Sequence, residues 1–339
     1  MKNVIIIDHE PFTKRRKEIF YIPQLFDRGY NIKVWSVSKL LYPDMVIADS
    51  INESYVTEIS SFENLESLIS LVDSSDTIFW IECFQQWHNR KVLKLVNNFV
   101  TVKIDLYANT TIKEPFSYKY KRLFSKELGR IITDKCFSLL FLLYKRICRI
   151  KDFNYHLSSS ATSSRTHIIN HPDFDCFIQS VSKSLFKEKY AVFCDNYFPY
   201  HPDFKNFFKV KKIPDGKRYQ DSLNLFFDYV EKNFNMPVVV AAHPKSEYCG
   251  TEFKGRKIIK YRTNELVSNS DLVIIHSSNS ISYAMLANKP TIFITTNGLN
   301  SIKNFNLRIK NLARTFNKKA YNIDQDSFDK YDFINDLKN

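Results

Sequence analysis

Two short apolar runs in the second half of the chain constrain the fold more than any other feature. Residues 237–241 read Pro-Val-Val-Val-Ala, residues 272–275 read Leu-Val-Ile-Ile, and polar residues follow each run closely. Such short runs of Val and Ile are typical of strands buried in a parallel sheet. Parallel strands end at one edge of the sheet, where α/β proteins bind ligands. The sequence therefore predicts an α/β fold with a binding edge after these two strands.

The residues after the two strands are suited to an anion. The first group is His243, Pro244 and Lys245, and the second, after His276, is Ser277, Ser278 and Asn279. The second group offers N-cap residues for a helix expected from Ser280, and a helix start attracts phosphate. The six glycines of the chain form no Gly-rich phosphate loop, so imidazole, hydroxyls and a helix end must hold the phosphate. His276 is interpreted as structural.

These two motifs resemble the HP and SS motifs of bacterial sialyltransferases and Kdo transferases, which are GT-B enzymes that use CMP-activated sugars. The resemblance covers residues 190–296 and implies that His243, Ser277 and Ser278 contact the CMP phosphate, beside Pro244, Lys245 and Asn279. It also implies transfer without a metal or other cofactor, because protein dipoles can stabilise a single leaving phosphate. Asp173-Phe174-Asp175 has the spacing of a metal motif, but we interpret it as a loop or acidic turn.

Asp195 is the predicted catalytic carboxylate, together with His243 in the leaving-group role. It follows the apolar run 190–194, so it should stand at the same sheet edge. A carboxylate there can act as base in an inverting reaction or as nucleophile in a retaining one. The resembling enzymes carry an acidic pair followed by Gly, whereas this chain has Asp195-Asn196. The alternative is that Asp195 only caps a turn.

Alternating strand-like and helix-like segments predict two Rossmann-like domains facing a cleft, the GT-B architecture. The first domain is assigned to residues 1–165 and the second to 185–315, with the serine-rich stretch 158–164 as a linker. Residues 316–339, with a helix near 327–337, are expected to cross back to the first domain. The first domain should bind the acceptor and the second the nucleotide sugar.

Candidate acceptor contacts lie where two strands of the first domain should end. They are Asp8, His9 and Glu10 after the first strand, Glu82 after a later one, and His201 from the second domain. Carboxylates and aromatic rings are groups to which sugars bind. The alternative is that these clusters are ordinary strand-to-helix turns.

The net charge of +13 is concentrated in one basic amphipathic segment, residues 113–151. It holds eleven Lys and Arg against three acids, which gives +8, around an apolar run at 136–144 too short to span a bilayer. An interfacial helix on anionic lipid is one interpretation, and a core helix with a basic outer face is the other. We expect no nucleic-acid partner, because no such motif is present. The six cysteines lack metal-ligand spacing and are expected to be reduced and mostly buried.

The sequence thus predicts a metal-independent glycosyltransferase that transfers a nonulosonic acid or Kdo-type sugar from CMP to a capsule, lipopolysaccharide or lipooligosaccharide acceptor. We expect it in the cytoplasm, peripheral on the inner face of the cytoplasmic membrane. Two alternatives stay open: a GT-B enzyme that uses a UDP-sugar, and a non-catalytic, membrane-associated component of a glycan assembly complex.

Overall fold

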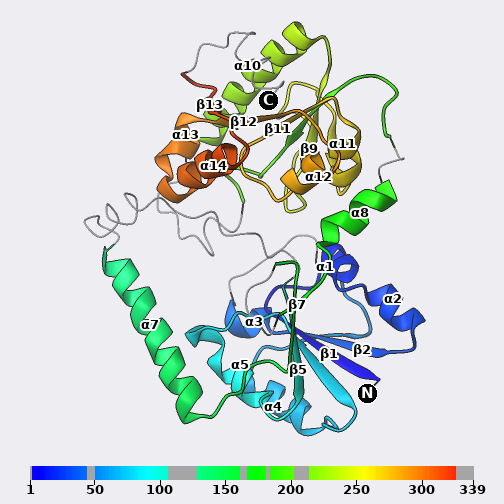
Figure 1. Cartoon of the computed structure of the whole chain (residues 1–339), viewed down its shortest axis with the longest axis vertical. Helices are drawn as coiled ribbons and strands as arrows, with labels where there is room; N and C mark the ends of the chain where they lie inside the picture. The colour runs from blue at the N-terminus through cyan, green and yellow to red at the C-terminus, as the bar shows by residue number, and fades with distance from the viewer. Residues whose placement is uncertain are drawn as a thin grey trace. The chain divides into compact units, whose positions relative to one another are not determined.

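The chain forms two compact units, Met1–His171 and Pro172–Asn339, each built around a parallel sheet (Figure 1). The structure is a computed structural model and describes residues 2–43, 50–105, 128–160, 166–180, 184–201 and 214–325. Each unit is treated separately below.

The first unit contains a seven-stranded sheet in the order β3-β2-β1-β4-β5-β6-β7, and all its paired strands are parallel. The strands are β1 (Asn3–Asp8), β2 (Asn31–Ser36), β3 (Val56–Glu58), β4 (Thr77–Ile81), β5 (Val100–Asp105), β6 (Tyr155–Ser158) and β7 (Thr166–Ile168). The helices are α1 (Lys14–Ile19), α2 (Ile22–Asp27), α3 (Ser38–Leu41), α4 (Phe62–Ser70), η1 (Trp87–Asn89), α5 (Arg90–Leu95) and α7 (Leu128–Ile147).

The second unit contains a six-stranded parallel sheet in the order β10-β9-β8-β11-β12-β13. The strands are β8 (Ala191–Cys194), β9 (Val238–Ala242), β10 (Ile258–Lys260), β11 (Leu272–Ile275), β12 (Thr291–Thr295) and β13 (Ala320–Asn322). The helices are α8 (Pro172–Ser180), α10 (Gly216–Phe234), α11 (Thr263–Asn269), α12 (Ile281–Leu286), α13 (Asn297–Ser301) and α14 (Lys303–Thr315). Counted from its own first strand, this sheet has the 3-2-1-4-5-6 order of a Rossmann fold.

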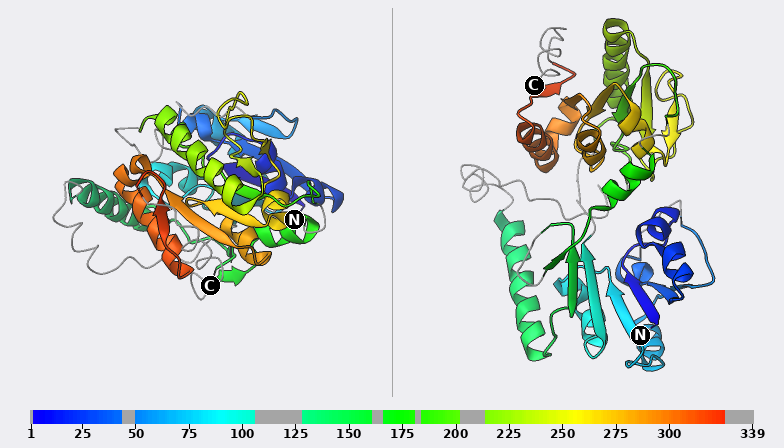
Figure 2. Two further views of the ribbon diagram at one scale, coloured as in Figure 1. Left: turned by 90° about the horizontal axis from the view of Figure 1, so that it is seen from above. Right: turned by 45° about the vertical axis from the view of Figure 1, so that its right-hand side comes forward.

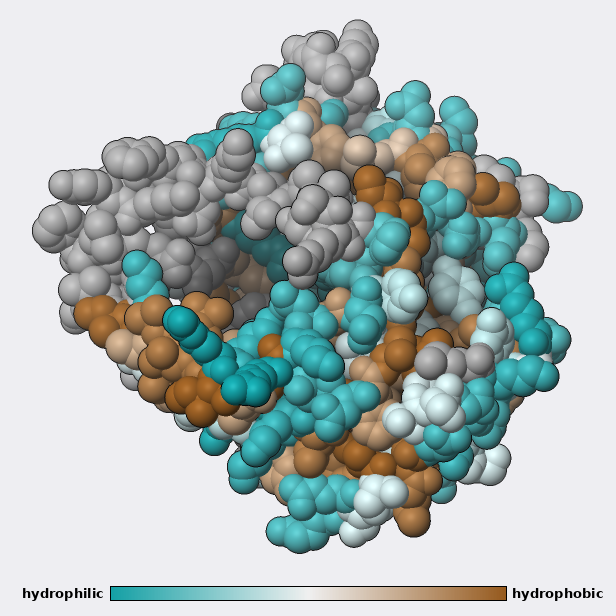
Figure 3. All heavy atoms as spheres, turned by 60° about the horizontal axis from the view of Figure 1, so that its bottom comes forward, coloured by the Kyte–Doolittle hydropathy of each residue, from teal (hydrophilic) through white to brown (hydrophobic). Residues whose placement is uncertain are grey.

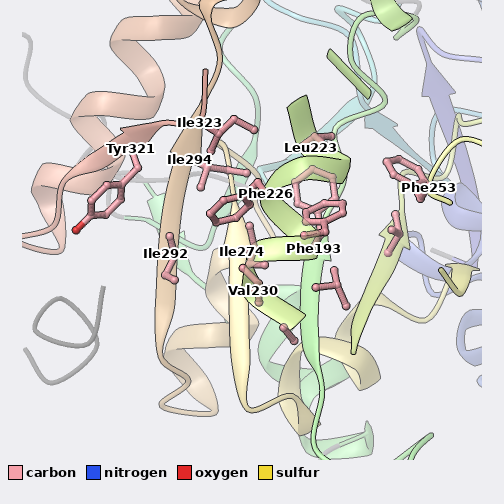
Figure 4. Close-up of a cluster of buried hydrophobic side chains, with 14 of the residues drawn as sticks. Phe193, Leu223, Phe226, Val230, Phe253, Ile274, Ile292, Ile294, Tyr321 and Ile323 are labelled. Atoms are coloured by element: carbon pink, nitrogen blue, oxygen red, sulfur yellow. The ribbon is translucent and has the colours of Figure 1, made fainter. Parts of the chain in front are cut away.

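Side-chain alternation along the strands divides each unit into two apolar layers. In β8, Ala191 and Phe193 pack with α10, while Val192 and Cys194 pack with α11 and α12 on the other face. Figure 4 shows Phe193 beside Phe226 of α10, within the layer that also holds Ile274 of β11. Strands covered on both faces must be apolar at every position, which explains the uninterrupted runs in the sequence.

The first unit is layered in the same way. Ile5 and Ile7 of β1 pack with α4 and α5, whereas Ile6 packs with Phe20 and Ile22 near α1 and α2. The ribbon views separate these helix layers on either side of the sheet (Figure 2). The segment 14–27 forms two helices rather than one, and Tyr21 between them takes a left-handed conformation with φ of 51°.

The expected domain limits differ from the division that the structure shows. Ser158, the first residue of the expected linker, ends β6, residues 161–164 lie outside the described residues, and the units divide after His171. In the C-terminal segment 316–339, residues Ala320–Asn322 form β13 on the edge of the second sheet. The predicted helix at 327–337 and its crossing back lie outside the described residues, as do residues 113–127 of the basic segment.

The cysteines are less buried than expected. Cys83 and Cys194 are buried, Cys148 and Cys176 are partly exposed, and Cys136 and Cys249 are exposed, all six as free thiols. The number and spacing of the cysteines do not show which of them lie in the core. The two buried thiols belong to the apolar layers that cover the two sheets. Within the part of the chain that the structure describes, no helix is long and apolar enough to cross a bilayer.

Phe193 should be a principal source of stability for the second unit. Its ring is fully buried on the central strand, 5.2 Å from the Phe227 ring and 5.4 Å from the His276 ring. We expect Phe193→Ala to lower the free energy of unfolding of this unit by about 3 to 5 kcal/mol, because the cavity cannot collapse in the sheet centre. Urea unfolding followed by circular dichroism measures it.

Leu225→Ala is the matched control, because Leu225 lies on α10 with 68% of its surface exposed. Its free energy of unfolding should change by less than about 0.5 kcal/mol. Equal effects of the two substitutions would contradict the assignment of the core.

Candidate functional site

The strand order places a binding edge at one point of the second sheet. β8 pairs with β9 on one side and β11 on the other, with Cys194 level with both Ala241 and Ile275. The residues that follow these three strands therefore emerge together. The strand order runs to β9 on one side of β8 and to β11 on the other, which makes this edge the switch point at which Rossmann folds bind nucleotides.

Asp195, directly after β8, is buried and accepts hydrogen bonds from three parts of this edge. Its Oδ1 accepts from Tyr197 N at 2.9 Å, and its Oδ2 accepts from His243 N at 3.3 Å and from the Tyr248 hydroxyl at 2.9 Å. Burial raises the pKa of the Asp195 carboxyl to about 6, and the three hydrogen bonds oppose that rise. The residue is 4% exposed. Its hydrogen bond from His243 N holds the turn after β9 against the end of β8.

His243 forms an imidazole pair with His201. Their Nε2 atoms are 3.3 Å apart, and the rings meet edge to face with centroids 4.5 Å apart. Lys245 N donates to Nδ1 of His243 at 3.1 Å, which leaves Nε2 as the protonated nitrogen of the neutral ring. Two imidazolium groups would place two N–H donors against each other, so the pair holds at most one positive charge. His201, predicted as an acceptor contact, thus lies with the predicted phosphate residue.

The serine segment after β11 is tied to the same edge. Asn196 Nδ2 donates to the carbonyl of Ser277 at 3.2 Å, which joins the residue beside Asp195 to the predicted phosphate serines. Ser277 is buried, and the Ser278 hydroxyl contacts the Ser280 hydroxyl at 3.2 Å and accepts from Ser280 N at 3.3 Å. The helix begins one residue later than expected: Ser280, not one of Ser277–Asn279, is the N-cap of α12.

His276 has the structural role expected of it. Its Nδ1 donates to the Ile294 carbonyl at 2.7 Å and its Nε2 accepts from the Tyr219 hydroxyl at 2.8 Å. Burial lowers the pKa of the ring to about 4, so the imidazole is neutral. It joins β11 to β12 and to α10 beneath the serine segment.

The carboxyl edge of the first sheet holds a second polar cluster, which contains the predicted acceptor residues Asp8, Glu10 and Glu82. Asp8, at the end of β1, is fully buried, accepts from Glu10 N at 3.1 Å and lies 3.2 Å from Arg16 Nε. Arg16 also pairs with Glu10 at 3.1 Å. Burial raises the pKa of Asp8 to about 7, while the Arg16 charge opposes the rise.

Glu82, after β4, extends this cluster across the sheet. It accepts from Trp80 Nε1 at 2.6 Å and lies 3.9 Å from Lys103 Nζ, and burial raises its pKa. Lys103 lies 3.6 Å from Asp105, which pairs with His156 at 2.6 Å. Ion pairs at this sheet edge therefore account for most of these charges. This fits the alternative that the clusters are ordinary strand-to-helix turns.

Two buried polar atoms of this cluster remain without a hydrogen bond in the described part of the chain. They are Oδ2 of Asp8, which has only its ion pair with Arg16, and Nδ1 of His9. The His9 ring lies 4.8 Å from the exposed Phe84 ring, and burial lowers its pKa to about 4. Unsatisfied buried polar atoms are unusual, and a hydroxyl-rich ligand can satisfy them.

Asp173 and Asp175 do not form the expected loop. They lie in the first turn of α8, and Asp173 accepts from the Ser282 hydroxyl and, at 3.0 Å, from the Tyr283 hydroxyl of α12. Asp173 thereby joins α8 to α12. Among the residues that the structure describes, no three His, Cys, Asp or Glu side chains gather as metal ligands do.

Three residues with a part in these clusters were not predicted. Asn196 was noticed only as a departure from a family motif, Tyr248 lies in a loop without a pattern, and Arg16 is one of several cations on α1. For Asn196, the one available sequence signal was its position next to Asp195. The other two depend on how loops fold back onto the sheet.

Comparison with known proteins supports the fold and little else. No protein-family model matches the chain, and no curated protein resembles it in sequence. The glycotransferase of kitacinnamycin shares 8% identity over 99% of this chain and 91% of its own, with a TM-score of 0.50. The spinosyn forosaminyltransferase SpnP (10% identity; 99% and 89% covered; TM-score 0.47) and the calicheamicin glycosyltransferase CalG4 (9%; 99% and 88%; 0.48) are also similar.

At such low identity the likeness is one of fold alone. It confirms the predicted α/β class with two Rossmann-like domains, the GT-B fold.

The burial of Asp195 predicts a pH-dependent stability. The pKa of Asp195 is about 6 in the folded state, above its ordinary value of 3.8. Between these pH values the carboxyl is ionised in the unfolded chain but protonated in the folded one, so rising pH lowers the free energy of unfolding. Relative to Asp195→Asn, the wild type should lose about 3 kcal/mol of stability from pH 3.5 to pH 7. Urea titrations of both proteins at several pH values measure the difference.

Asp228→Asn is the control with opposite sign, because hydrogen bonds from Arg256 and Lys254 lower the pKa of Asp228. The contribution of Asp228 to stability is present above its unfolded pKa and is lost as pH falls. A pH-independent difference between wild type and Asp195→Asn would refute the proposed burial.

Proposed function

We propose that the protein is a glycosyltransferase that moves a nonulosonic acid or Kdo-type sugar from a CMP-activated donor to a hydroxyl of a glycan or glycolipid. The observation that carries this proposal is the meeting of the His243 turn and the Ser277–Asn279 segment at the switch point of the second sheet. The residues resemble the HP and SS motifs in type, order and strand position. The fold supports the same activity class.

The charge at this edge suits a monophosphate better than a diphosphate. The His201–His243 pair supplies at most one positive charge, and Lys245 is the cation next to it in sequence. CMP leaves as a phosphate dianion, whose charge one imidazolium and the Lys245 ammonium together would match. UDP carries a further phosphate, whose charge would require additional cations or a metal ion.

The proposed transfer exchanges one bond at the anomeric carbon of the donor sugar. The bond between the anomeric carbon and the phosphate oxygen breaks, and CMP departs with the bonding electron pair. Nε2–H of His243 exchanges His201 for the departing phosphate as its acceptor, and the Ser277 and Ser278 hydroxyls with Asn279 supply further donors. The acceptor oxygen forms the new bond to the anomeric carbon and gives its proton to a base.

The geometry of Asp195 favours a positioning role over direct chemistry. We predicted it as base or nucleophile, yet it is buried and already accepts hydrogen bonds from Tyr197, His243 and Tyr248. A positioning residue acts through His243 by fixing the turn that carries the imidazole. The base role stays a prediction and is separated from positioning in the experiment below.

The acceptor is proposed to bind at the carboxyl edge of the first sheet. His9 and Asp8 contribute the buried atoms without hydrogen bonds there, and Glu10 and Glu82 contribute carboxylates. A sugar hydroxyl can donate to Oδ2 of Asp8 and pair with Nδ1 of His9. Phe84, half-exposed beside His9, provides an apolar face for a ring.

Nucleotide binding tests the proposal. CMP, without metal, should raise the melting temperature by about 5 °C at about 100 times the dissociation constant, more than CDP, UMP, UDP or GDP at equal concentration. His243→Ala should remove the shift, because it deletes the imidazole at the phosphate. Lys254→Ala is the matched control, since Lys254 lies near the start of β10, away from this edge, and its shift should equal that of the wild type.

Asp195→Asn separates the two roles of that residue. If Asp195 positions His243, the substitution should reduce both the melting-temperature shift caused by CMP and the release of CMP from CMP-N-acetylneuraminate. If Asp195 is the base, the shift should stay intact while turnover falls by about 100-fold or more. Preference for UDP would replace the CMP donor by a UDP-sugar. No response to any nucleotide would reject the enzyme and favour a non-catalytic component.

A further inference from the structure

Helix α7 presents an apolar face to solvent, which is the reverse of an ordinary surface helix. Toward the first sheet it packs through Phe141 and Tyr144, with the Tyr144 ring 5.9 Å from Trp87. On the other side, Leu139 and Leu143 are 60% and 56% exposed. Amphipathic helices normally place polar residues outward, so this arrangement needs a partner.

The exposed residues form one continuous surface along the helix. At 100° per residue, Ile132, Leu139, Leu142 and Leu143 lie within one side of α7, opposite Phe141. Leu140 and Ile147 border this side and are also exposed. Figure 3 shows the brown apolar surface of this region, with hydrophilic side chains across it. We call these six residues the α7 surface.

Cations accompany the α7 surface. Lys135 and Arg146 fall on the same side of the helix as Leu139, and Arg149 follows the helix end, all three exposed. From Lys135 to Lys151 the sequence has five Lys and Arg and no acid. Among the described residues, Lys145 is the one of these five that pairs with an acid, Asp152.

This combination selects an anionic lipid surface as the partner. Exposed leucines insert among acyl chains while Lys and Arg reach the phosphate headgroups, which is how interfacial helices bind. A second copy of the chain is disfavoured, because pairing two α7 surfaces would bring like charges together. An uncharged apolar protein groove would leave the cations without counter-charges.

We propose that the α7 surface docks the first unit on anionic lipid, with α7 lying in the plane of the interface. Leucines supply the insertion, and Lys135, Arg146 and Arg149 supply the preference for negative headgroups. This docking does not depend on the donor proposed above. It would hold the first unit, the proposed acceptor domain, at a surface where lipid-linked acceptors reside.

Vesicle co-sedimentation of the full chain tests the proposal. The wild type should bind vesicles of phosphatidylcholine with about 30 mol% phosphatidylglycerol, bind weakly to phosphatidylcholine alone, and dissociate as NaCl rises from about 0.1 M to about 0.5 M. Leu139→Ser with Leu143→Ser should reduce partitioning at least about tenfold, because less apolar surface inserts. Arg146→Gln with Arg149→Gln should remove the preference for the anionic vesicles.

Leu225→Ser is the matched control, because Leu225 is as exposed as these leucines but lies on α10 of the second unit. It should bind like the wild type, and equal melting temperatures should show that all variants fold. Wild-type binding by the leucine variant, or no binding of the wild type, would overturn the proposal. So would a wild-type dimer that Leu139→Ser converts to monomer without any vesicle binding.

Discussion

The buried carboxylate at the end of β8 is the interaction on which the candidate site depends. Asp195 accepts from Tyr197 N, His243 N and the Tyr248 hydroxyl, so one side chain holds three loop segments at the sheet edge. Removing it from water raises its pKa to about 6, and the hydrogen bonds return part of that cost. Strand register brings the ends of β9 and β11 to β8, and the Asp195 contact adds the side-chain anchor for the turn that carries His243.

The first unit also has a buried carboxylate at a strand end, with a different partner. Asp8 also ends the first strand of a Rossmann sheet, and it accepts from the N–H two residues on, as Asp195 does. There the second partner is Arg16, and burial still raises the pKa of Asp8 to about 7. Each unit thus fixes its carboxyl edge with a buried acid. We propose that imidazole and hydroxyl groups at the second edge bind a phosphate, and that buried polar atoms at the first bind sugar hydroxyls.

The central strands could be predicted because burial on both faces demands continuous apolar runs, as in β9 and β11. The short strands β6 and β7 could not, since their positions depend on pairing at the edge of β5. The break at Tyr21 was also unpredictable, because its left-handed conformation has no local pattern. For the site, strand ends placed Asp195, His243 and Ser277 together, whereas Tyr248 and Arg16 arrive through loop and helix packing that no spacing encodes.

Hydrogen exchange of the wild type with and without CMP measures most directly whether the second sheet carries the nucleotide. Protection should concentrate in residues 243–248 and 277–283, because the phosphate orders the turn after β9 and the start of α12. Residues 187–190 and 254–257, at the opposite sheet end, should exchange at unchanged rates. Protection confined to those residues or to the first unit would contradict a nucleotide site at the end of β8.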